Sequence, residues 1–419
     1  MYYRAASFRF VPQSVILRDN MEPTTMAIAK APQAFPRTEY LRRLAAVKSE
    51  MARREIDALI ISSWGNITYL TGNVTRMLAV HALVVSIQDE EPTLIVRKMC
   101  APGAAHQSFM AREKIIGYSE NLVGKANTDG YDAVIDFLHD VGVAQGGIGL
   151  EQGNLMAPAV EKFIGKLPQA RIVDCTRVVD WIRGVKSDLE IAVMREAAAL
   201  ADAAVMRARD VIRPGVREAD AAVEIMAAQV NGVKGGPAAT GLRPPLISST
   251  PRTGTPHILW SESVFSDGMQ INSEVSGNRY NYLAALMRTF SIGAPADRVR
   301  RLHDAQVAAI ETALDLIRPG RTCSEVAHAM YSAIEKHGFP KESRCGYSIG
   351  IENQFTAWIE PTASFGREDM TVLQTNMTFH LMLGNWVEEE FGVTVSETIR
   401  VTDTGVEALT CAPRELFVL

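Results

Sequence analysis

The chain has few of the features that mark a secreted, membrane-bound or nucleic-acid-binding protein. Its five cysteines are odd in number and widely spaced, with no CxxC pair, which is typical of reduced thiols in a cytoplasmic protein. No apolar run approaches the roughly 20 residues that cross a bilayer. No basic block is present and the formal charge is -5, so neither nucleic acid nor an anionic membrane is indicated. We expect a cytoplasmic protein whose partners are small molecules or other proteins.

The first segment also lacks the pattern of a secretory signal. Residues 1–36 carry three arginines but no continuous apolar stretch ahead of a small-residue cleavage site. We expect a loosely packed extension. Met21 and Met26 lie within it, and translation could begin at either.

The rest of the chain has the composition of a globular protein. With 419 residues, of which 47% are hydrophobic and 22% charged, it is long enough for two packed domains. Helical periodicity over residues 40–54 and 132–141 alternates with short apolar runs that are typical of strands. These runs cover residues 58–62, 81–85, 93–96, 147–150 and 171–173. The alternation predicts a smaller α/β domain over residues 37–180.

A second domain is expected over residues 181–419. Ser187 and Glu190 have the spacing of a capping box, which predicts the start of a long helix. A helical stretch, then Arg-Pro-Gly, then a new helix occurs over residues 204–220 and again over residues 309–325. Chance is the alternative, because this is a common local arrangement. Duplication predicts an α+β domain with internal pseudo-symmetry and a cleft between its halves.

Five segments stand in a fixed order along the chain. They are residues 66–72 (NITYLTG), 182–190 (IRGVKSDLE), 288–289 (RT), 346–350 (GYSIG) and 397–402 (ETIRVT). In this order they resemble the creatinase/aminopeptidase P family. The resemblance implies a pita-bread α+β catalytic domain preceded by a creatinase-type α/β domain. It also implies a homodimer in which the small domain of one subunit closes over the other subunit's cleft.

Metallopeptidases of that family hold two metal ions through two aspartates, a histidine and two glutamates. The matching positions of this chain are Glu274, Ala285, Tyr347, Met382 and Ser396. Hard cations each need several oxygen or imidazole ligands, so one carboxylate cannot hold a pair. The resemblance therefore predicts no metal and no other cofactor. A metallopeptidase would require an alignment that is wrong by several residues.

A further set of segments resembles one metal-free branch, the ectoine hydrolases. They are residues 255–260 (TPHILW), 274–277 (EVSG), 343–350 (SRCGYSIG), 377–386 (MTFHLMLGNW) and 413–417 (PRELF). Creatinase, another metal-free branch, has Gly-His and Met-Glu-Pro patterns that are absent at Tyr347 and Met382. The resemblance implies a metal-independent hydrolase that opens a cyclic amidine C–N bond, most simply converting ectoine to N-acetyl-2,4-diaminobutyrate.

Glu274 and His257 are the expected catalytic residues. Glu274 lies in a strand-like alternation over residues 270–276, where a solvent-facing glutamate is the ordinary outcome. Its coincidence with a metal-ligand position favours a nucleophile or a base that activates water. His257 ends a loop-like stretch rich in Gly, Thr and Pro. A lone histidine is often structural, but an imidazole can protonate a leaving nitrogen near neutral pH, and the position matches a catalytic histidine of the family.

Other polar and aromatic residues are expected to bind the substrate. The predicted set is Tyr347, Trp260, Trp386, Glu360, Glu397 and Arg288. The tyrosine brings a phenol that can donate a hydrogen bond, and tryptophans can enclose a cationic ring, although core packing is their commoner role. Arg344 and Arg367 are alternatives to Arg288 for a substrate carboxylate. His328 and His380 are expected to be structural.

Two alternatives remain open from the sequence. A metal-free hydrolase of another guanidino or amide compound would use the same residues on a different substrate. A non-catalytic pita-bread protein that binds peptides or protein partners would not need Glu274 at all.

Overall fold

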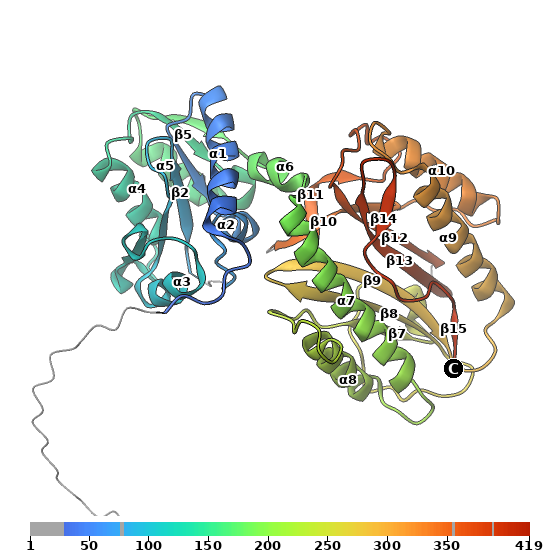
Figure 1. Cartoon of the computed structure of the whole chain (residues 1–419). Helices are drawn as coiled ribbons and strands as arrows, with labels where there is room; N and C mark the ends of the chain where they lie inside the picture. Colours follow the sequence, from blue (N-terminus) through green and yellow to red (C-terminus); the bar gives the residue numbers. More distant parts are fainter. Residues whose placement is uncertain (1–28, 76–78, 354–356, 388) are drawn as a thin grey trace, which may run out of the picture.

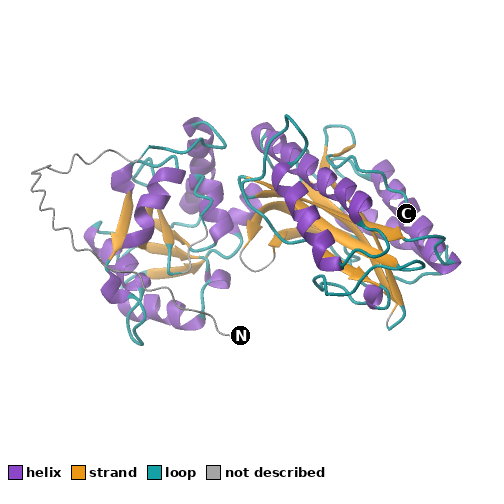
Figure 2. Ribbon diagram, turned by 90° about the horizontal axis from the view of Figure 1, so that it is seen from below, coloured by secondary structure: helices purple, strands orange, loops and turns teal. Residues whose placement is uncertain are grey.

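Two domains lie side by side and are joined through one short helix, α6 (Val178–Gly184) (Figure 1). The structure, a computed structural model, describes residues 29–75, 79–353, 357–387 and 389–419. Both domains combine helices and strands (Figure 2). Among the described residues, no helix combines the length and the apolar character that a membrane span requires.

The N-terminal domain is built on a six-stranded sheet in the order β4-β3-β2-β1-β5-β6. Its strands are β1 (Ala58–Ile61), β2 (Ala82–Ser86), β3 (Thr93–Arg97), β4 (Ile115–Tyr118), β5 (Gly147–Leu150) and β6 (Arg171–Asp174). Its helices are α1 (Arg37–Arg53), α2 (Trp64–Thr71), α3 (Ala101–Gln107), α4 (Gly130–Asp140) and α5 (Ala157–Lys166). The helices and strands expected from periodicity in this part of the chain are therefore confirmed.

The end of the N-terminal extension differs from the loose packing that we expected. The Ala31 backbone N–H donates to the His106 carbonyl at 2.7 Å, and Lys30 Nζ donates to the Ser108 carbonyl at 2.9 Å. Phe35 is buried, and its ring lies under the Arg43 guanidinium. The apolar ring explains the packing, because its burial removes it from water. Residues 1–28 lie outside the described part.

The C-terminal domain contains a nine-stranded sheet whose main path is β14-β13-β12-β10-β9-β8-β7, with β11 on β10 and β15 on β9. The strands are β7 (Leu246–Ser249), β8 (Gln270–Arg279), β9 (Tyr282–Ser291), β10 (Gly346–Asn353), β11 (Ala357–Ser364), β12 (Thr378–Val387), β13 (Phe391–Val401), β14 (Val406–Ala408) and β15 (Phe417–Val418). The helices are α7 (Asp188–Val211), α8 (Glu218–Asn231), α9 (Asp297–Leu316) and α10 (Cys323–Glu335).

The predicted repeat appears as two helix pairs that cover different parts of the sheet. Helix α7 packs on β8 and β9, and α9 packs on β12 and β13 (Figure 1). Ser187 caps α7 in a capping box with Glu190, as predicted. In each pair the first helix ends just before Arg-Pro-Gly, where Gly215 and Gly320 take positive φ angles of 86° and 89°. A residue with a Cβ rarely adopts that conformation, which explains the shared motif.

The two faces of β8 have different surroundings. Ile271 and Val275 pack with the helices in one buried cluster. Gly277 faces the same way, and a Cβ on it would lie 1.9 Å from the Ala197 carbonyl oxygen of α7. Because side chains alternate along a strand, Glu274 faces the opposite side, toward the interior of the curved sheet. Close packing of β8 on α7 thus holds Glu274 on the inner face.

Candidate active site

A small pocket, partly open to solvent, surrounds Glu274. Its walls come from β7, β8, β9, β12, β13 and the loop that contains His257. Trp386 of β12 lies in the wall. The structure thus brings together three residues that the sequence singled out: Glu274, His257 and Trp386.

The Glu274 carboxylate has an unusual environment. Burial raises the pKa of Glu274 to about 8, and the nearby Arg243 charge opposes this rise. Among the described residues, none donates a hydrogen bond to this carboxylate. An acid of this kind is held mainly neutral at pH 7, and a cationic ligand would favour its ionised form. The site is therefore suited to a positively charged small molecule.

His257 lines the same pocket from a left-handed backbone conformation with φ of 61°. Residues other than glycine adopt this conformation uncommonly, and such positions occur at functional sites more often than elsewhere. The side chain is largely exposed. An exposed imidazole beside Glu274 can exchange protons with both solvent and a bound molecule.

Aromatic and basic side chains gather near Glu274 on β10, β11 and the preceding loops. Tyr347 is buried, and its pKa is raised by burial and by the charge of Glu274. The Arg344 guanidinium lies 4.5 Å from the centre of the Tyr347 ring. The Arg243 guanidinium lies 5.7 Å from the centre of the Trp358 ring. Arg344 and Arg243 thus each approach one of these rings, and the Arg243 charge also acts on Glu274.

Arg243 is a site residue that sequence reasoning missed. It lies between α8 and β7, in a stretch rich in Gly and Pro that has no periodic pattern. Only its charge could have drawn attention, and many arginines share that property. Its importance emerges from the fold, which brings this loop toward Glu274 and Trp358.

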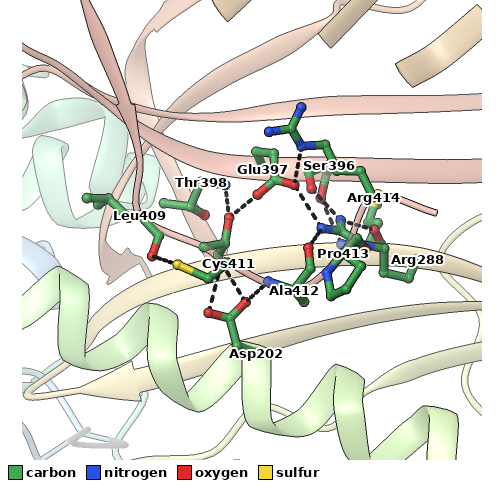
Figure 3. Close-up of polar contacts among 12 residues, drawn as sticks. Asp202, Arg288, Ser396, Glu397, Thr398, Leu409, Cys411, Ala412, Pro413 and Arg414 are labelled. Atoms are coloured by element: carbon green, nitrogen blue, oxygen red, sulfur yellow. Dashed lines mark hydrogen bonds and ion pairs between the residues drawn. The ribbon is translucent and has the colours of Figure 1, made fainter. Parts of the chain in front are cut away.

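Arg288 and Glu397, both predicted to bind substrate, lie in a separate buried network (Figure 3). Arg288 Nη2 donates to Glu397 Oε1 at 2.8 Å, and Arg414 lies 3.2 Å from the same oxygen. Arg288 also donates to the carbonyls of Ala412 and Pro413. These contacts fasten the C-terminal segment to β9 and β13. Each charge is paired within the protein, so we assign both residues a structural role.

Glu360 and Trp260 are also placed away from the pocket wall. Glu360 is buried, and its carboxylate lies 2.5 Å from Lys186 Nζ and 3.8 Å from Arg183 Nε. It thus joins the sheet to the segment that connects the domains. Trp260 packs beside the buried cluster of α7, α8 and β8. Arg367 stacks on Tyr331, with its guanidinium 3.8 Å from the ring centre.

The residues at the five positions that the family resemblance matches to metal ligands do not fit a pair of metal ions. Glu274 is the only carboxylate among them. The Ser396 hydroxyl is engaged by the Met287 backbone N–H at 2.7 Å. Within the described ranges, no group of three or more His, Cys, Asp or Glu side chains could hold a metal ion. An alanine, a methionine and a hydrogen-bonded serine do not supply the oxygen ligands that hard cations require.

Comparison with known proteins identifies both domains. Residues 192–403 match the model of metallopeptidase family M24, and residues 43–185 match that of the creatinase/prolidase N-terminal domain. The chain is 57% identical to the uncharacterized hydrolase/peptidase y4tL of Sinorhizobium fredii, over 94% of this chain and all of that protein. It is 34% identical to the ectoine hydrolase of Halomonas elongata, over 92% and 98% of the two chains.

Solved structures confirm the predicted fold. The dipeptidase PepE of Mycobacterium ulcerans superposes with a TM-score of 0.77 at 22% identity, over 92% of this chain and 99% of that one. The creatinase-type domain followed by the pita-bread domain is therefore the architecture of this protein.

Proposed function

This chain belongs to metallopeptidase family M24, and from that premise we propose that it is a metal-independent hydrolase of a cyclic amidine, with ectoine as its first candidate substrate. The observation that carries the proposal is the placement of Glu274 in a pocket with His257 and Trp386, while its four companion positions lack metal ligands. The similarity to the ectoine hydrolase of Halomonas elongata supports the choice of substrate.

The charges of the site suit a small zwitterion. An amidinium ring would pair with the ionised Glu274 carboxylate. The positive charge of the ring would stabilise the ionised form and so oppose the rise in the Glu274 pKa that burial causes. The indole of Trp386, in the pocket wall, offers further attraction to a cation. Arg243 or Arg344 would hold the substrate carboxylate, since a guanidinium matches the two carboxylate oxygens.

The proposed reaction uses Glu274 as nucleophile and His257 as proton shuttle. A carboxylate oxygen bonds to the amidine carbon, one of its two C–N bonds breaks, and His257 gives a proton to the departing nitrogen. Water then adds to the carbon of the enzyme-bound acyl imidate, the Glu274 carboxylate leaves, and the nitrogen that remains on this carbon ends as an acetamide. An amidinium carbon is already electrophilic, because its charge is spread over two nitrogens. Activation of water by Glu274 would give the same products.

We further propose that the protein is a cytoplasmic homodimer. Its five cysteines are all free thiols, which suits a reducing compartment. The dimer is implied by the family resemblance, and light scattering on the purified protein tests it.

The function is tested by following ectoine ring opening by NMR. The wild-type protein is compared with Glu274→Gln, which keeps the shape of the side chain but cannot attack, and with Glu262→Gln at an exposed position. Turnover by wild type and Glu262→Gln, but not by Glu274→Gln, would support the proposal. Creatine and related guanidino compounds are run in parallel. If only those compounds were turned over, the substrate would be a guanidino compound and not ectoine. If no compound were turned over, a non-catalytic binding protein would be favoured.

A further inference from the structure

The loop over residues 250–260, the His257 loop, forms one wall of the Glu274 pocket. Residues 255–258 line the pocket, and His257 is among them. A 3₁₀ turn, Arg252–Gly254, precedes this stretch. A catalytic side chain must be held in a productive geometry, and a loop depends for this on its contacts with the rest of the protein. The contacts of the His257 loop therefore decide where the imidazole lies.

One fully buried carboxylate, Glu218 at the first position of α8, contacts both ends of the His257 loop. At the start of the loop, Glu218 Oε1 accepts a hydrogen bond from Arg252 Nη2 at 2.7 Å and another from Ser249 Oγ. At the end of the loop, Glu218 Oε2 accepts from the Ser261 backbone N–H at 2.6 Å and from Ser261 Oγ at 2.7 Å. A single side chain thus fastens the two ends of the loop to α8.

These contacts keep Glu218 ionised although it is buried. Burial opposes the charge, but the hydrogen bonds from Ser249, Ser261 and Arg252 lower the pKa of this carboxyl. Both of its oxygens act as acceptors, which requires the form without a proton. Arg252 Nη2 also donates to Ser261 Oγ at 3.1 Å, so the two ends of the loop contact each other. A buried polar network whose members are all hydrogen-bonded holds its groups in one arrangement.

The middle of the loop rests on the strand that contains Glu274. Thr253 is buried, and Asn272 Nδ2 of β8 donates to its carbonyl oxygen at 3.3 Å. The same Nδ2 donates to the Gly392 carbonyl oxygen of β13 at 2.9 Å. Asn272 is two residues before Glu274, so both side chains lie on the same face of β8. The contacts of the loop therefore also set the position of His257 relative to Glu274.

Resting on the proposed function of the Glu274 pocket, we propose that Glu218 is a positioning residue that holds His257 where it can give a proton to the departing nitrogen. Side chains alternate along β7, so Ser248 faces the pocket while Ser249 faces Glu218 behind it. Glu218 thus acts on the reaction only through the loop. Proton transfer needs its two heavy atoms about 3 Å apart, so a small shift of the loop takes the imidazole out of reach.

The kcat of ectoine ring opening by Glu218→Gln tests this role. The amide keeps the size of the side chain but replaces one accepting oxygen with a donor, which then faces N–H and O–H groups that need an acceptor. We expect kcat to fall roughly 10- to 100-fold, because misplacement by about 1 Å can cost 100-fold. Glu325→Gln is the matched control and should keep the wild-type kcat. Glu325 is exposed and lies in the first turn of α10, the corresponding helix of the second pair.

A double-mutant cycle with His257→Gly separates positioning from general damage to the protein. If Glu218 acts through His257, Glu218→Gln should lower kcat less than about threefold in a protein that already lacks the imidazole. The loop is also a wall of the pocket, so KM should rise with Glu218→Gln in both backgrounds. Equal losses of kcat with and without His257 would overturn the proposal, because Glu218 would then support the fold alone.

Amide hydrogen exchange tests the same contacts without substrate. The Ser261 N–H donates to Glu218, and the Thr255 N–H donates to the Arg252 carbonyl oxygen at 2.9 Å. Both should exchange at least tenfold faster in Glu218→Gln, while the N–H groups of residues 222–231 in α8 keep the wild-type rate. Unchanged exchange at Ser261 and Thr255 would also overturn the proposal.

The two measurements distinguish a failure of this proposal from a failure of the proposed function. If ectoine is not turned over, the proposed function fails, while faster exchange in the His257 loop would still show that Glu218 fixes the loop. If Glu218→Gln does not fold, Ser261→Ala takes its place in both experiments, because it removes a single hydroxyl from the network. Its loss of kcat should be several-fold and should disappear in the His257→Gly background.

Discussion

Arg288 Nη2 lies 2.8 Å from Glu397 Oε1, and both side chains are at most 1% exposed. Removal of one partner from a buried pair leaves an uncompensated charge, which destabilises proteins by roughly 3–5 kcal/mol. Arg414 also contacts Glu397, so we expect Arg288→Met to lower the free energy of unfolding by about 3 kcal/mol.

Urea denaturation measures this loss, and Arg321→Met is the control. Arg321 pairs with Glu325 at the surface, 3.4 Å apart, and such pairs contribute about 0–1 kcal/mol. The KM of the folded Arg288→Met fraction should stay near that of wild type. A large rise in KM with unchanged stability would show that Arg288 binds the substrate.

Glu274 should make stability depend on pH in a specific direction. Its pKa is about 8 in the folded protein, above the ordinary value of 4.5, so the folded state holds a proton that the unfolded state releases between these values. Its stabilising contribution is complete below pH 4.5 and is lost as pH rises through 8.

The Glu274→Gln variant isolates this contribution, because all other titrating groups are shared. Relative to wild type, the variant should gain about 2 kcal/mol of unfolding free energy between pH 5 and pH 9, since one pKa unit corresponds to about 1.4 kcal/mol and solvent access reduces the full effect. Parallel stability curves for the two proteins would show that burial does not raise this pKa.

His257 has a chemical role that can be separated from its backbone strain. With φ of 61°, the position accepts glycine readily. His257→Gly should therefore change stability by less than about 1 kcal/mol, yet lower kcat by roughly 100- to 10,000-fold, as expected when a proton shuttle is removed. Thermal unfolding and steady-state kinetics on one preparation measure both. An unchanged kcat would show that His257 shapes the loop and transfers no proton in the reaction.

Gly277 holds β8 against α7 and so supports Glu274. A Cβ at this position would lie 1.9 Å from the Ala197 carbonyl oxygen, which is backbone and cannot turn away. Gly277→Ala should destabilise the protein by about 3 kcal/mol and also reduce turnover, because β8 must shift. Gly184→Ala, where no atom lies within 4 Å of the added Cβ, should have little effect.

Much of the fold could be predicted from the sequence because its signals are local. The strands of the smaller domain follow from short apolar runs, and α7 begins directly after Ser187 because Ser187 and Glu190 are the two ends of a four-residue capping box. The Arg-Pro-Gly repeats likewise mark the ends of α7 and α9. Such signals depend only on neighbours along the chain.

The site residues were harder to predict because they depend on contacts between distant segments. Glu397 and Arg288 are 109 positions apart in sequence and form an ion pair with each other. Their charges alone do not reveal this pairing. His380 was expected to be structural, and its link to Tyr347 and Ser396 emerges only when β10, β12 and β13 are placed side by side. Arg243 lies in a loop without a pattern and was missed for the same reason.

Metal independence is tested most directly by ectoine turnover with protein that has been freed of metal. The protein is treated with chelator, its metal content is measured by elemental analysis, and ring opening is followed by NMR. We predict the same kcat before and after treatment, with less than about one metal ion per ten chains, because one carboxylate does not hold a metal pair. Loss of turnover on chelation, restored by added divalent metal, would contradict the metal-independent mechanism built on Glu274.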